Sequence, residues 1–142
     1  MVDGERREPR RGWLLLAVAV SGASGLSPVQ LERSLFLVCQ KREEHVGPDF
    51  YQFESNGSGP ASAALYVDID ALVTAEHIVK EWAPESSCSI FRLSDSGRAR
   101  AADFRRRTKK EALAGLEDAV AWVKEQSYQE MVHKTSTVRV IR

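Results

Sequence analysis

The stretch PASAALYVDIDALVTAEHIVKEWAPESSCSIFRL, Pro60 to Leu93, decides the fold of this 142-residue chain. Its first half predicts a helix from Ala61 to about Thr74, because apolar residues recur there at helical spacing. Two β-prone segments follow, His77–Trp82 and Ser89–Leu93, with a polar, Pro-containing turn between them. We therefore expect a helix followed directly by an antiparallel hairpin.

A second helix is expected ahead of this unit, from Pro28 to about Arg42. Ser27 is placed to cap it, Pro28 suits its first position, and Gln30 can close a capping box. Phe50–Phe53 alternates like a short half-buried strand. The Gly/Pro-rich cluster Ser55–Pro60 predicts a turn in which Pro60 opens the helix that begins at Ala61.

The N-terminal segment allows two interpretations. Four arginines precede the apolar run Trp13–Val20, and small residues follow to Gly25, so residues 6–25 fit a secretory signal. The alternative, which we favour, is a first core helix from Arg11 to Ser21, because a small helical core needs such a helix to cover its neighbours. Residues 1–10 are then expected to be a disordered basic N-terminus.

After the hairpin, Ser94–Gly97 predicts the start of a short helix that runs to about Phe104. Thr108 and Glu111 form a second expected capping box for a long helix, Lys109 to about Gln126. A final short helix is expected from Tyr128. The resulting organisation is a central domain over residues 11–104, a helical extension over 105–134 and a tail over 135–142.

The composition is that of one globular domain: 43% of residues are hydrophobic, 28% are charged and the formal net charge is zero. Cys39 and Cys88 lie far apart without metal-type spacing, which indicates packed, reduced thiols of a cytoplasmic protein. The three histidines are scattered, and no nucleophile elbow or phosphate-binding loop is present. We therefore expect no enzyme activity, no cofactor and no metal site.

Charge is unevenly distributed along the chain. Acidic residues dominate from Glu43 to Glu85, where Lys80 is the single base, whereas bases dominate from Arg98 to Lys110 against Asp103 alone. The basic residues are Arg98, Arg100, Arg105, Arg106, Arg107, Lys109 and Lys110. Such a cluster can bind nucleic-acid phosphates, pair with the acidic half of the chain or a partner, or form a solvated connector.

The order of elements from Leu26 to Phe104 resembles that of winged-helix DNA-binding regulators. More narrowly, it is similar to small bacterial winged-helix proteins related to Panacea-type antitoxin domains, whose three motifs are matched by Leu31–Leu37, Gly57–Ser62 and Asp68–Leu72 followed by Ile78-Val79. The tyrosines of the family's loop are absent here. The resemblance implies an α+β, mainly α fold: a winged-helix core of three helices and a β-hairpin wing, with extra C-terminal helices.

The resemblance implies a regulator or a partner-binding module, and the residues qualify both. The helix Ala61–Thr74 would enter the major groove of DNA, yet it contains no base, so attraction to duplex DNA must come from the Arg98–Lys110 cluster. The alternative is an antitoxin- or adaptor-type module that binds a protein, such as a toxin, through Ser62, Tyr66 and Asp70. A homodimer is expected through the Leu113–Val123 face or the helix at Trp13.

Overall fold

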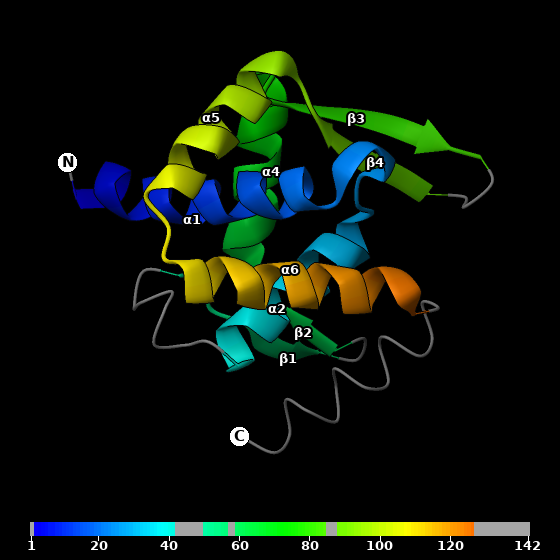
Figure 1. Ribbon diagram of the computed structural model, residues 1–142. Coiled ribbons are helices and arrows are strands. Elements are labelled where there is room, and N and C mark those ends of the chain that lie inside the picture. Colours follow the sequence, from blue (N-terminus) through cyan, green and yellow to red (C-terminus); the bar gives the residue numbers. More distant parts are fainter. Residues whose placement is uncertain (1, 42–49, 57–58, 85–87, 127–142) are drawn as a thin grey trace.

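The computed structural model describes residues 2–41, 50–56, 59–84 and 88–126 (Figure 1). The expected class, α+β and mainly α, is confirmed, because helices dominate and the strands form two antiparallel hairpins. The elements are α1 (Val2–Val20), the 3-10 turn η1 (Gly22–Ser24), α2 (Pro28–Lys41), β1 (Glu54–Asn56), β2 (Gly59–Ala61), α4 (Ala63–Thr74), β3 (Ile78–Ala83), β4 (Cys88–Leu93), α5 (Asp95–Arg106) and α6 (Lys110–Glu125).

Helix α1 is the centre of the molecule (Figure 1). Every side chain from Trp13 to Val18 is buried, and α1 contacts α2, α4, α5, α6 and β4. A helix that is apolar on all sides needs neighbours on all sides, and here it has them. The apolar run therefore forms a core helix, as expected.

The predicted disordered segment, residues 1–10, is wrong for the part that the structure describes. Helix α1 begins at Val2, well ahead of the expected start at Arg11. This segment contains Gly4 and Pro9 besides its Glu and Arg residues, so helix propensity alone does not account for the early start. No helix in the described ranges combines the length and hydrophobicity that crossing a membrane requires.

The predicted hairpin is confirmed. Strands β3 and β4 pair antiparallel, with Ile78 opposite Leu93, and the apolar side of the pair packs on the core. Leu26, between α1 and α2, exchanges two backbone hydrogen bonds with Phe91 of β4, at 3.1 and 2.8 Å. The short segment around Leu26 therefore lies along β4, on the side away from β3.

The connection between α2 and α4 differs from the expectation. Phe50–Phe53 is irregular rather than a strand, because both Phe50 and Tyr51 point inward, which an alternating strand forbids. Phe50 packs edge-on against Trp13, with ring centroids 6.1 Å apart. Where a turn was expected over Ser55–Pro60, Glu54–Asn56 and Gly59–Ala61 pair as the antiparallel strands β1 and β2, and helix α4 begins only at Ala63.

The caps explain where several helices begin. Ser27 and Gln30 form the expected capping box on α2, with reciprocal hydrogen bonds of 2.9 and 3.2 Å. The hydroxyl of Ser94 accepts from the amide of Gly97 at the start of α5, as expected. The capping box predicted at Thr108 is wrong: its hydroxyl donates to the Phe104 carbonyl, and α6 begins at Lys110 without a side-chain cap.

Helix α6 closes the core. Its buried face, Leu116, Val120 and Val123, belongs to the core, and the helix packs mainly on α2 and also contacts α1. The two surfaces expected to form a dimer, this face and Trp13, are thus covered within one chain, and a dimer would need another surface. Cys39 and Cys88 are both partly buried, and neither is part of a disulfide. The predicted final helix and tail lie outside the described residues.

Candidate functional site

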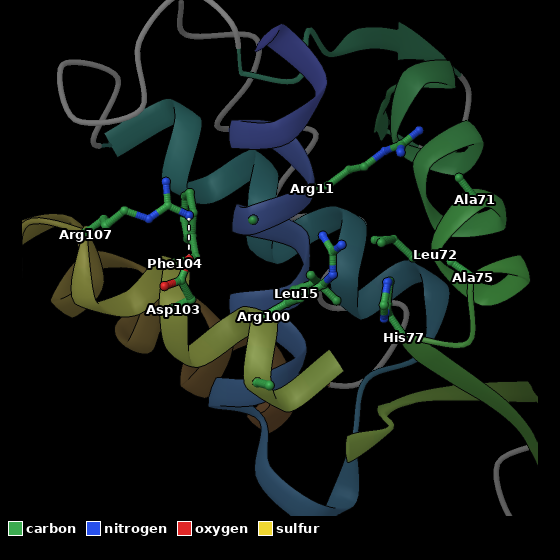
Figure 2. Close-up of a pocket in the computed structure, with 12 residues that line it drawn as sticks. Arg11, Leu15, Ala71, Leu72, Ala75, His77, Arg100, Asp103, Phe104 and Arg107 are labelled. Atoms are coloured by element: carbon green, nitrogen blue, oxygen red, sulfur yellow. Dashed lines mark hydrogen bonds and ion pairs between the residues drawn. The ribbon is translucent and has the colours of Figure 1, made fainter. Parts of the chain in front are cut away.

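A groove of about 760 Å³ lies between α4 and α5, with α1 along its floor (Figure 2). Small residues on the α4 side keep it open, namely Ala71 and Ala75, while Leu15, Leu72 and Phe104 make its walls apolar. The polar side chains that line it are Arg11, His77, Arg100, Asp103 and Arg107.

The spacing along α5 explains why these side chains share one wall. Arg100, Asp103, Phe104 and Arg107 follow one another at steps of three, one and three residues, which places them on one helix face. Phe104 packs edge-on against Trp13, with ring centroids 5.6 Å apart. A Cβ atom added at Gly12 would overlap the Phe104 ring, so this glycine is what allows α5 to lie against α1.

The arginines of the groove differ in how their charge is balanced. Arg11 donates to buried Asp68 at 3.0 Å, and Arg107 donates to Asp103 at 3.1 Å while its guanidinium lies over the Phe104 ring. Arg100 makes no hydrogen bond or ion pair to any residue that the structure describes. Figure 2 shows Arg100 and His77 pointing into the same space. The groove therefore contains one positive charge without an acidic partner in the described ranges.

The pKa of His77 responds to this charge. Partial burial and then the positive charge of Arg100 lower the pKa of His77 below its usual value, and its Nδ1 lies 2.8 Å from the Ser96 hydroxyl oxygen. At neutral pH the imidazole is therefore uncharged. Because the unfolded chain takes up this proton at a higher pH, His77 reduces the stability of the fold as pH falls below about 6.5.

One end of the groove is anchored by a buried polar cluster. The fully buried carboxylate of Asp68 accepts from Arg11 at 3.0 Å and from the Tyr51 hydroxyl at 2.7 Å, with the Arg10 Nε atom 3.6 Å away. Burial and the neighbouring carboxylate raise the pKa of Tyr51, so its phenol keeps the proton that it donates. The cluster ties α1, α4 and the segment before β1 together.

Asp68 is thus an acid on the apolar face of a helix. On α4, Asp68 lies with Leu65, Ile69 and Leu72 on the buried face, and the arginines of α1 supply the charge that makes its burial tolerable. Ser62, expected to contact a partner, is also buried: its hydroxyl accepts from the Leu65 amide and caps α4. Tyr66 and Asp70 are exposed, as expected.

The basic residues expected to bind nucleic acid fall into two groups. Arg100 and Arg107 line the groove. The others form an exposed basic ridge along α5 and the start of α6, defined as Arg98, Arg105, Arg106, Lys109 and Lys110. Some ridge arginines have acidic neighbours: Arg98 contacts Asp95, Arg105 lies 3.6 Å from Glu117, and Arg106 binds Asp103.

Large apolar side chains are exposed on two elements. Tyr66 and Val67 project from α4, and Val79 and Trp82 project from β3; Val67 is 62% exposed and Trp82 is 65% exposed. The other two tryptophans differ from Trp82: Trp13 lies in the core, and the partly buried Trp122 packs against it.

Two groove residues escaped the sequence analysis. Arg11 was assigned to the boundary of a basic leader or tail, and His77 was treated as one of three scattered histidines. A signal for Arg11 was present: an acid, Asp68, on the apolar face of a helix requires a buried basic partner from elsewhere in the chain. His77 had no comparable signal, because its neighbour Arg100 is 23 positions away in sequence.

No protein-family model, curated protein or solved structure matches this chain. Within the described ranges, no three His, Cys, Asp or Glu side chains come together so as to hold a metal ion. The features of this chain that bear on function are the groove, the basic ridge and the exposed apolar side chains.

Proposed function

We propose that this protein is a non-enzymatic winged-helix regulator that binds duplex DNA through its basic ridge. The chain order supports the fold assignment: α1, the Leu26 segment, α2 and α4 are followed by the β3–β4 hairpin, with Leu26 paired to β4. In this assignment α4 is the helix that faces DNA and β3–β4 is the wing. The β1–β2 hairpin is an insertion into the turn between α2 and α4, which is normally three or four residues long.

The observation that carries the proposal is the surplus of exposed positive charge at the α5–α6 corner. Between Ser94 and Lys110 the chain has seven bases against two acids, Asp95 and Asp103. The ion pairs of the ridge are exposed, and such pairs contribute little to stability. Their guanidinium groups can therefore exchange a carboxylate for a phosphate at small cost.

The exposed face of α4 determines what kind of binding to expect. Tyr66, Val67, Asp70 and Thr74 are exposed there, and none offers the Arg, Lys, Asn or Gln contacts that distinguish bases in the major groove. Asp70 would oppose an approaching phosphate. Binding through the ridge is thus expected to depend strongly on salt and only weakly on base sequence.

A fluorescence titration against labelled duplex DNA tests this proposal. Each phosphate contact contributes about −0.9 to the slope of log affinity against log salt concentration. The variant R105Q/R106Q/K109Q/K110Q should therefore bind far more weakly and lose about 3 from the magnitude of that slope. K80Q removes a charge from the hairpin, outside the ridge, and should change affinity less than about twofold. An absence of binding by the unmodified protein at low salt contradicts the proposal.

A second function, a protein-interaction module of the antitoxin or adaptor type, is favoured by a separate observation. The exposed Tyr66 and Val67 lie on the same helix as the exposed acid Asp70, which suits a partner with an apolar surface and basic residues around it. This surface is distinct from the basic ridge, so the two functions can be tested apart.

Affinity capture with the tagged full-length protein separates them. V67K places a charge in the exposed apolar surface and should abolish capture of a specific partner, because a lysine there must be desolvated in the interface. The four-site ridge variant should still capture that partner. Equal recovery of the same proteins by the unmodified chain and by V67K counts against a module that uses α4.

A further inference from the structure

We propose that the groove between α4 and α5 binds a small organic anion, an aromatic carboxylate, with Arg100 as the residue that binds the carboxylate. This inference goes beyond DNA binding by the ridge and does not depend on it. Its elements are an arginine without an acidic partner among the described residues, an apolar floor beside that arginine and a cavity of suitable size.

The charges of the groove single out Arg100. Arg11 contacts Asp68 and Arg107 contacts Asp103, each carboxylate being shared with a second arginine, whereas Arg100 has no acidic partner among the described residues. The positive charge of Arg100 adds to the effect of burial and lowers the pKa of His77, because it disfavours the protonated imidazole. Because His77 is uncharged at neutral pH, it neither repels nor neutralises Arg100, and a bound anion would supply the counter-charge that Arg100 lacks among the described residues. A planar guanidinium also matches the two oxygens of a carboxylate.

The apolar walls determine the rest of the ligand. Leu15 of α1, Leu72 of α4 and Phe104 of α5 line the groove, and Ala71, Ala75 and Ala99 leave space instead of filling it. Ligand sites typically have volumes of about 300–1,000 Å³, and this groove of about 760 Å³ falls within that range; its lining combines these apolar side chains with five polar or charged ones. A ring attached to the carboxylate would contact these walls, which a bare inorganic anion would not.

The fit also explains why an aromatic carboxylate is preferred to a phosphate. Asp103 lines the groove and would repel a dianion more strongly than a monoanion. Phe104 lines the groove, and a ligand ring that packs beside it would gain affinity beyond burial alone. Acetate, phosphate and benzyl alcohol each lack one of the features that the groove is inferred to recognise.

An NMR titration of the full-length protein with benzoate tests the inference. Benzoate should shift the amide signals of Ala71, Ala75 and Ala99, and should bind about tenfold more tightly than acetate, inorganic phosphate or benzyl alcohol. R100Q should lose about tenfold or more in benzoate affinity. R105Q, on the same helix but outside the groove, should remain within about twofold of the unmodified chain.

The His77 ring supplies a readout that general loss of structure would not mimic. Benzoate should raise the pKa of His77 in the unmodified protein, because it neutralises Arg100. R100Q should raise the same pKa without any ligand and make it insensitive to benzoate. Equal benzoate affinity of R100Q and the unmodified protein, or equal affinity for acetate and benzoate, overturns the inference. Because no DNA is present, the result is independent of the titration that tests the ridge.

Discussion

Replacing Asp68 with alanine is expected to lower the free energy of unfolding by about 3–5 kcal/mol, as measured by urea denaturation. The substitution leaves the Tyr51 hydroxyl without its acceptor and removes the counter-charge of Arg11 and Arg10. Buried or half-buried polar groups that lose their partner bear the full cost of desolvation. The loss should exceed that of an ordinary surface substitution several-fold.

Asp70 provides the matched control, since it lies two positions along the same helix but is exposed. D70A should change the unfolding free energy by no more than about 0.5 kcal/mol. D68N keeps the shape of the side chain and an acceptor for Tyr51 but loses the charge, so its stability should fall between D68A and the unmodified chain. If D68A and D70A unfold at the same urea concentration, the Asp68 cluster does not hold α1 against α4.

Gly97→Ala should destabilise the fold by about 1–3 kcal/mol, although alanine is the better helix former. A Cβ atom at this position would overlap the backbone carbonyl of His77. That carbonyl cannot easily move, because the Ser94 amide donates to it at 3.1 Å and the Ser94 hydroxyl at 3.2 Å. The start of α5 would have to shift away from β3.

Thermal unfolding and the His77 ring signals together check this prediction. The shift of α5 should lower the melting temperature and also change the chemical shift of His77, whose Nδ1 lies against Ser96. Ala102, exposed on the same helix, provides the control: A102S also adds one heavy atom and should leave both readouts unchanged within about 0.5 kcal/mol. A more stable G97A protein would mean that helix propensity outweighs this close approach.

Local patterns predicted the elements well wherever the partners are close in sequence. The capping box of Ser27 and Gln30 formed as expected, and the helix expected to start within Ser94–Gly97 does so, with the Ser94 hydroxyl accepting from the Gly97 amide. The same rule failed at Thr108, whose hydroxyl is turned toward the preceding helix, where it donates to the Phe104 carbonyl, and does not accept from an amide of α6. A local pattern does not say which of two nearby partners the packing will favour.

In the candidate site, too, local features could be predicted from the sequence and contacts between distant segments could not. The density of bases from Arg98 to Lys110 is visible in the chain, and so is a helical phase that puts Arg100 and Arg107 on one face. That this face meets Arg11 and His77 in one groove depends on α4 and α5 packing on either side of α1. Gly97 is a further example. Helix propensity favours alanine at this position, but the His77 carbonyl, which only the tertiary structure places there, leaves no room for its Cβ atom.

Periodicity, caps and turn residues were enough to predict the fold class, the β3–β4 hairpin and the basic segment from Arg98 to Lys110. Each of these is a property of residues that are neighbours in the chain. Three features emerged only in three dimensions: the burial of Asp68, the lack of an acidic partner for Arg100 among the described residues, and the division of the bases between groove and ridge. The physical reason is that Coulomb interactions and desolvation depend on distances between side chains. Arg11 and Asp68 are 57 positions apart in sequence, and the packing of α1 on α4 brings the Arg11 Nε atom to 3.0 Å from an Asp68 carboxylate oxygen.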